Sequence, residues 1–102
     1  MKHFIIEITY RIPADQLGEL RVQHRQYLQT AGYAAGLCLF SGPQVPPIGG
    51  LIVARAESAA EIEEFTRHDP FRVNGVADYR IIEFDPVLSR PEMADWIAGA
   101  QG

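Results

Sequence analysis

The chain has very little cysteine: among its 102 residues the one thiol is Cys38, within the apolar run Leu37–Phe40. A single thiol cannot form an internal disulfide, and a cysteine among apolar neighbours usually packs as a small hydrophobic side chain. We therefore expect a fold held by a hydrophobic core, and a reducing cytoplasm is the expected location.

Long apolar runs are also missing. No stretch approaches the ~20 apolar residues that a membrane helix needs. The first ten residues, MKHFIIEITY, are interrupted by Glu7 and are too short for a signal-peptide core. We expect neither a membrane span nor a secretion signal.

Positive charge is sparse as well, with nine Lys and Arg against 13 Asp and Glu and a net charge of −4. Because no basic stripe is present to neutralise phosphates, nucleic-acid binding is not expected. The hydrophobic fraction of 47% and the charged fraction of 22% are ordinary for a globular protein. A chain of this length fits one domain around a single core.

Hydrophobic spacing predicts the order βαββαβ followed by a tail helix. Gly32 and Gly36 are expected to close the first helix, and Asp69-Pro70 is expected to end the second. Ser58 with Glu61, and Ser89 with Glu92, predict capping boxes at the starts of the second and the tail helix. The expected strands span 3–10, 37–40, 51–56 and 77–84, the first helix spans 17–31, and a turn fills 41–50.

This order predicts an α+β fold, with residues 1–88 as the domain and 89–102 as a C-terminal helix and tail. Right-handed crossovers place both main helices on one face of a four-stranded sheet. Leu37–Phe40 and Leu51–Ala54 are apolar on both sides, which is typical of strands covered on both faces. We expect a second copy to cover the other face in a homodimer; the alternative is that the tail helix folds under its own sheet.

His24 is the most unusual residue of the chain. Its spacing from Leu20 and Leu28 places it on the inward, apolar face of the first helix. One interpretation is a core histidine whose ring nitrogens bond to backbone or water, because an unpaired imidazole is costly to bury. The other is an acid–base catalyst, because histidine side chains exchange protons near neutral pH.

Asp69 is the second unusual residue, because a carboxylate at the C-terminal end of a helix faces the negative pole of the helix dipole, at a cost of roughly 0.3–1 kcal/mol. Asp69 could cap a following turn that begins at Pro70. It could instead orient an imidazole, as carboxylates do in many acid–base pairs. A cap and a pair partner look identical in sequence, so both interpretations stay open.

The remaining polar residues carry weaker signals. His3, His24 and His68 lie 21 and 44 residues apart, which matches no zinc spacing, so neither a metal nor a cofactor is expected. Ser41 lacks the glycine framing of a nucleophile elbow, and no helix follows Gly49-Gly50 as in a phosphate loop. The residues expected to serve mainly in the sheet, with pocket lining as the alternative, are Tyr10, Tyr79 and Arg80.

An ordered set of short motifs resembles the YCII-related family. The motifs run from about Lys2 to Pro86, and they are His24-Arg25 with Tyr27-Leu28, Ser41-Gly42-Pro43, Gly49-Gly50, Ala56 with Ser58, Asp69-Pro70-Phe71 and Asn74-Gly75-Val76. The resemblance implies a dimeric ferredoxin-like fold, akin to the muconolactone isomerase assembly, and an active-site His and Asp that fall on His24 and Asp69. The chain departs from the family around Pro46-Pro47 and beyond Leu88. One characterised branch of this family eliminates chloride from a chlorinated hydroxyhydroquinone.

Together these features predict a cofactor-free lyase or isomerase that transfers a proton on a small organic substrate such as a hydroxylated ring. His24 is the expected general base or acid, and Asp69 holds its tautomer. The expected substrate-binding residues are Ser41, Phe71 and Tyr10. The alternative is a non-catalytic, dimeric module that binds a small ligand or serves as an accessory domain, in which the same pair is a buried polar network.

Overall fold

The structure, a computed structural model, describes residues 1–100. The four strands are β1 (Lys2–Tyr10), β2 (Cys38–Pro43), β3 (Gly49–Ala56) and β4 (Ala77–Phe84). The α-helices are α1 (Glu19–Tyr27), α2 (Ala59–Arg67), α3 (Pro70–Val73) and α4 (Ala94–Ala98). Short 3₁₀ turns occur at Ala14–Gln16 and Pro91–Met93, and a π-helical stretch over Leu28–Ala34 continues α1. None of the helices within residues 1–100 is long and apolar enough to cross a membrane.

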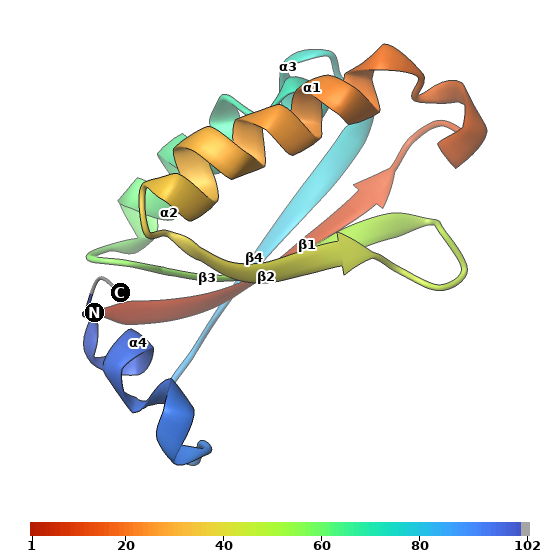
Figure 1. The fold of residues 1–102 in the computed structure, drawn as a ribbon. Coiled ribbons are helices and arrows are strands. Elements are labelled where there is room, and N and C mark those ends of the chain that lie inside the picture. The colour runs from red at the N-terminus through yellow and green to blue at the C-terminus, as the bar shows by residue number, and fades with distance from the viewer. Residues whose placement is uncertain (101–102) are drawn as a thin grey trace.

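The sheet is antiparallel and has the order β2-β3-β1-β4. Figure 1 shows α1, α2 and α3 on one face of this sheet and α4 on the opposite face. The fold is therefore the predicted α+β fold of ferredoxin-like type. The edge strands of the sheet are β2 and β4. β2 follows α1 in the chain, and β4 follows α2 and α3.

The core lies between the sheet and the helical layer. Alternate residues of β1 point into it, because successive side chains of a strand face opposite sides, and Phe4, Ile6 and Ile8 are each no more than 1% exposed. The other buried apolar residues are Leu17, Leu28, Cys38, Ile52, Ala54, Ala56, Ile62, Phe65, Phe71 and Ala77.

The first helix differs from its prediction at both ends. α1 begins after Gly18, and Gly32 does not end it, because the π-helical stretch carries the chain through this residue to Ala34. Gly36, with φ +81°, closes the segment. Gly32 serves packing instead: a methyl group there would lie 2.7 Å from the Cys38 sulfur.

The second strand also differs, because it continues through Ser41 to Pro43 instead of stopping at Phe40. A bulge between Cys38 and Phe40 shifts its register against β3. Cys38 opposes Ala54 in the core, and Ser41 opposes Ile52 on the same face. Side chains alternate with a period of two, so without the extra residue Ser41 would point to the other face. Gly49-Gly50, predicted as a turn, begins β3.

Only one of the two predicted capping boxes contributes a cap. The Ser58 hydroxyl accepts a hydrogen bond from the Glu61 amide at the start of α2, and the Glu61 carboxylate accepts one from the Glu57 amide. In the tail, Arg90 occupies the cap position and no side chain caps the turn at Pro91–Met93. Ser89 therefore makes no cap, contrary to its prediction.

The tail helix α4 packs under the sheet at one end. Its Trp96 carbonyl accepts a hydrogen bond from the buried Arg55 guanidinium, and the Trp96 ring lies 5.7 Å from the His3 ring. The tail helix therefore covers its own sheet beside His3 and Arg55, as the alternative expectation proposed. Beyond it, large apolar side chains remain exposed on the same face: Phe40, Leu51, Ile82 and Phe84.

Candidate functional site

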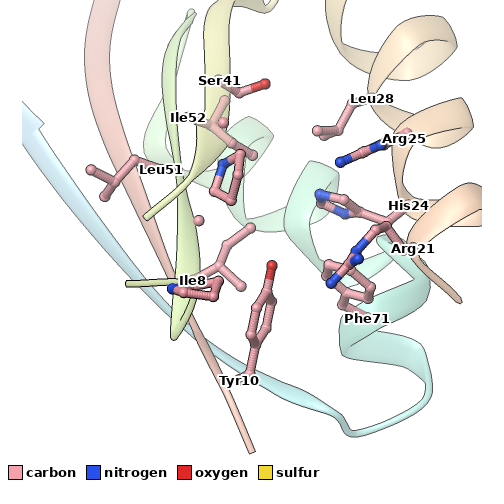
Figure 2. A pocket seen from close by; sticks show the side chains of 14 residues that line it. Ile8, Tyr10, Arg21, His24, Arg25, Leu28, Ser41, Leu51, Ile52 and Phe71 are labelled. Atoms are coloured by element: carbon pink, nitrogen blue, oxygen red, sulfur yellow. The ribbon is translucent and has the colours of Figure 1, made fainter. Parts of the chain in front are cut away.

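A cavity of about 440 Å³ opens between α1 and the sheet. Figure 2 shows side chains from α1 facing side chains from β1 and β3 across it. The residues that line it come from α1 and the stretch after it, from α3, from β1, β2 and β3, and from the loop before β3: Ile8, Tyr10, Arg21, His24, Arg25, Leu28, Ser41, Gly42, Pro43, Pro47, Gly50, Leu51, Ile52 and Phe71. Its size and its largely apolar wall suit one small organic molecule.

His24 enters this cavity from α1 and bonds to Asp69 behind it. Nδ1 of His24 lies 2.8 Å from Oδ1 and 2.9 Å from Oδ2 of Asp69. The imidazole side chain is 12% exposed and the carboxylate is 2% exposed. A carboxylate can only accept hydrogen bonds, so Nδ1 carries a proton and Nε2 is the ring nitrogen left for a ligand.

Asp69 has a second bond, because its Oδ1 accepts a hydrogen bond from the Phe71 amide at 3.1 Å. Asp69 is the N-cap of α3, with Pro70 as the first helical residue. α2 ends before it, with His68 at its C-cap. The two interpretations of Asp69 that the sequence left open are therefore compatible: one carboxylate caps α3 and also contacts the imidazole.

Phe71 fixes the imidazole plane from one side. Its ring stacks on that of His24 with 4.1 Å between centroids and 11° between planes. Tyr10 meets Phe71 edge-on at 5.7 Å, and Figure 2 shows the Tyr10 hydroxyl directed into the cavity. The turn that begins at Asp69 thus supplies both a hydrogen-bond acceptor and a stacking surface to one imidazole.

Tyr79 on β4 approaches the pair from the core. Burial, and next the negative charge of Asp69, raise the pKa of Tyr79, so its phenol stays protonated. Its hydroxyl is buried and makes no hydrogen bond to the described residues. Tyr79 does not line the cavity, and Arg80, its neighbour on the opposite face, pairs with Glu7.

The wall opposite α1 depends on β2 and on the loop before β3. Ser41 lines the cavity, and its hydroxyl lies 2.5 Å from that of Tyr33. Pro47, in the loop before β3, lines it too.

The other two histidines lie outside the site. His68 is 61% exposed and bonds to Glu64 on α2, and His3 is buried against Trp96 on the far face of the sheet. Within residues 1–100, no three His, Cys, Asp or Glu side chains are arranged to hold a metal ion.

Two arginines that the sequence analysis did not select, Arg21 and Arg25, also line the cavity. Arg21 precedes His24 by three residues, which places the two on one helix face. This spacing could have pointed to Arg21. The only sequence signal for Arg25 is its place beside His24 in the family motif, because its helical spacing is that of an ordinary solvated residue.

The fold and the sequence were compared with known proteins. One solved structure with a similar fold is 5-chloro-2-hydroxyhydroquinone dehydrochlorinase from Burkholderia phenoliruptrix AC1100, in complex with 2,5-dihydroxybenzoquinone. The TM-score is 0.58 at 21% sequence identity, and the alignment covers 80% of this chain and 92% of that one. Among curated proteins no sequence matches.

The family comparison covers most of the chain. The family model described as the YCII-related domain matches residues 1–85, which include all four strands, the cavity and both members of the His24–Asp69 pair. The chain belongs to the YCII-related family.

Proposed function

We propose that the chain is an enzyme, a lyase or isomerase that moves a proton on a small organic substrate held in the cavity between α1 and the sheet. The observation that carries this proposal is that His24 lines the cavity together with Phe71 and Tyr10 and lies 2.8 Å from the Asp69 carboxylate behind it. His24 acts as general base or acid through Nε2. Asp69 is the positioning residue that holds the tautomer and stabilises the imidazolium when His24 takes up a proton.

The surroundings of the pair support acid–base chemistry. Phe71 and Asp69 hold the imidazole from two directions, so little reorganisation is needed when the proton moves. Positioned proton transfer of this kind contributes about 10²–10⁴-fold in rate. Ser41 and Tyr10 are the proposed hydroxyl partners of the substrate.

The structural neighbour supports the substrate class. The name of that enzyme describes removal of chloride from a hydroxylated ring, and its bound ligand is 2,5-dihydroxybenzoquinone. We extend to this chain only the class: a small ring that bears hydroxyl or carbonyl oxygens.

A single buried thiol, Cys38, fits a reducing cytoplasm as the place of action.

The proposal is tested by turnover of hydroxylated aromatic rings, hydroxyquinones and lactones, followed by absorbance, chloride release and NMR. We expect His24→Gln to lower turnover about 10²–10⁴-fold, and His68→Gln, which alters an exposed histidine outside the cavity, to leave it unchanged. Two results would contradict the proposal: wild-type turnover by His24→Gln, or a wild-type protein that binds these compounds and converts none.

The alternative is a non-catalytic module that binds a small ligand. The observation in its favour is the structural role of Asp69, whose carboxylate caps α3. In a module of this kind, the variants His24→Ala and Asp69→Ala lose about 1–3 kcal/mol of stability because each strands a buried partner. Because Asp69 caps α3 in either case, such losses alone do not identify a module. Turnover discriminates the two functions: a module binds hydroxylated rings and converts none.

We also propose that the exposed face of the sheet pairs with a second copy in a homodimer. Phe40 is 63% exposed and Ile82 is 37% exposed, and they lie on different strands of the face that α4 leaves open. A contiguous apolar face of this kind is usually covered by a partner in a soluble protein. Residues 1–88 would form the paired domain, with 89–102 as an appended tail, of which residues 101 and 102 lie outside the described part of the chain.

Sedimentation equilibrium tests this assembly. Ile82→Lys on the open sheet face should shift the protein from dimer to monomer. Val22→Lys, on the exposed side of α1, is the matched control and should leave the mass unchanged. A wild-type monomer at all concentrations would refute the homodimer.

A further inference from the structure

The cavity is positively charged although the protein is acidic. The net charge of the chain is −4, yet the side chains that line the cavity include two arginines and one histidine and no aspartate or glutamate. Asp69 contributes one negative charge from behind His24. With a neutral imidazole, the site therefore carries +2 from the arginines and −1 from Asp69, a net charge of +1.

The two cavity arginines are not neutralised by carboxylates. Arg21 donates from Nη2 to the Ala14 carbonyl at 2.8 Å, which holds the guanidinium without cancelling its charge. Arg25 makes no hydrogen bond or ion pair with any residue in 1–100. Outside the cavity, four arginines pair with acidic residues: Arg11–Asp78, Arg67–Glu64, Arg72–Glu63 and Arg80–Glu7. The buried Arg55 donates to the Gly36 and Trp96 carbonyls instead.

The cavity is polar on one side and apolar on the other. Figure 2 shows Arg21, His24 and Arg25 reaching in from α1, while Ile8 and Ile52 face them from the sheet. A planar ring fits against the apolar wall with an oxygen-bearing edge turned toward the guanidinium groups. A guanidinium recognises a carboxylate, or a pair of conjugated oxygens, through two parallel N–H donors.

We propose that this site selects an anionic substrate: a single-ring acid that is ionised at neutral pH, such as an aromatic carboxylate or an acidic hydroxyquinone. The Arg25 guanidinium binds the anionic group of this substrate. This inference rests on the proposed function for the role of His24, and it adds the charge of the substrate. The anionic oxygens bind the guanidinium groups and leave a different edge of the ring to His24. The same positive charges stabilise the negative charge that develops when His24 removes a proton.

The test compares acids with uncharged analogues of the same shape: aromatic carboxylates with carboxamides, and hydroxyquinones with their methyl ethers. Binding is followed by NMR shifts of Tyr10 and Phe71. We expect each acid to bind at least about tenfold more tightly than its analogue, since one charge-assisted hydrogen bond supplies this difference. Added salt should weaken binding of the acids alone.

Variants assign the effect to a residue. Arg25→Gln should weaken binding of the acids about tenfold and leave the uncharged analogues unaffected. Arg67→Gln, which removes an exposed arginine from α2, is the matched control and should change neither. Equal binding of acids and analogues, unchanged binding by Arg25→Gln, or no binding of any compound at millimolar concentration would each overturn the inference.

His24→Gln separates this inference from the proposed function. If the variant and the wild type both bind the acids and neither shows turnover, the charge selection stands and the catalytic role fails. If His24 is required for turnover of an uncharged substrate that Arg25→Gln converts equally well, the catalytic role stands and the charge selection fails.

Discussion

His24 and Asp69 are separated by 45 residues in the sequence, and in the fold Nδ1 of His24 lies within 2.9 Å of both carboxylate oxygens of Asp69. The contact joins α1 to the turn that begins α3. Removal of either side chain leaves the buried polar group of the other without its hydrogen-bond partner. The pair therefore affects stability as well as chemistry.

Substitutions of Asp69 should separate its two bonds. Asp69→Ala removes the α3 cap and strands the imidazole, and we expect a loss of about 2–4 kcal/mol of unfolding free energy. Asp69→Asn retains an oxygen that can cap Phe71, so its loss should be about 1–2 kcal/mol. Urea unfolding at neutral pH measures both. Equal losses for the two variants would mean that the cap does not contribute.

Gly49 should tolerate no side chain. A methyl group at this position would lie 1.7 Å from the Ile8 carbonyl oxygen, so the strand pair must shift to admit it. We expect Gly49→Ala to cost about 3 kcal/mol or more, measured by urea unfolding. Gly42→Ala is the control on the neighbouring strand, because no atom lies within 4 Å of its added methyl group. Comparable stability of the two variants would argue against this register of β1 and β3.

The Cys38 thiol should be unreactive in the folded protein. Burial raises the pKa of Cys38 to about 12, so the thiolate that attacks disulfide reagents is scarce near neutral pH. We expect an aromatic disulfide reagent to modify the native protein at least about 100-fold more slowly than the unfolded chain. Modification at the same rate in both states would show that Cys38 is accessible.

The raised pKa of Cys38 also determines whether the free energy of unfolding rises or falls with pH. Because the folded pKa lies above the unfolded value of ~8.5, the neutral thiol contributes its full stability below about pH 8. This contribution is lost as the pH rises toward 12. Unfolding free energies should therefore fall more steeply over this alkaline range in the wild type than in Cys38→Ala. Parallel curves would contradict the assignment to Cys38.

The two serines predicted as helix caps should differ in stability effect. Ser58→Ala removes the bond that the Glu61 amide donates at the start of α2, and we expect a loss of about 1 kcal/mol. Ser89→Ala removes no cap and should stay within about 0.5 kcal/mol of the wild type. Thermal unfolding of the two variants measures the difference, and equal shifts would count against the cap at Ser58.

Local patterns were sufficient for the elements with strong periodicity. β4 has the predicted limits, and β1 differs by one residue, because alternation of apolar side chains specifies a half-buried strand directly. The limits of β2 were wrong for a physical reason. Its bulge depends on pairing with β3, and pairing energy does not appear in the sequence of either strand alone.

Some features of the cavity followed from local sequence patterns, and others depended on the tertiary structure. The inward position of His24 followed from helical spacing, and the cap at Asp69 followed from the proline after it. The position of Arg25 at the cavity could not follow from helical spacing, because an arginine on a helix usually faces solvent. It became visible only when the sheet, α3 and the loop that holds Pro47 enclosed a space beside it.

The sequence by itself determined the order of strands and helices, the single core and the side of α1 that His24 occupies, since these depend on the period of hydrophobic residues along short segments. Only the tertiary structure decided that Asp69 reaches His24 and that Ser41 turns inward. It alone also decided that two arginines without carboxylate partners line the same cavity as His24. These relationships join residues far apart in the chain, and they depend on how helices and strands pack rather than on what each segment prefers.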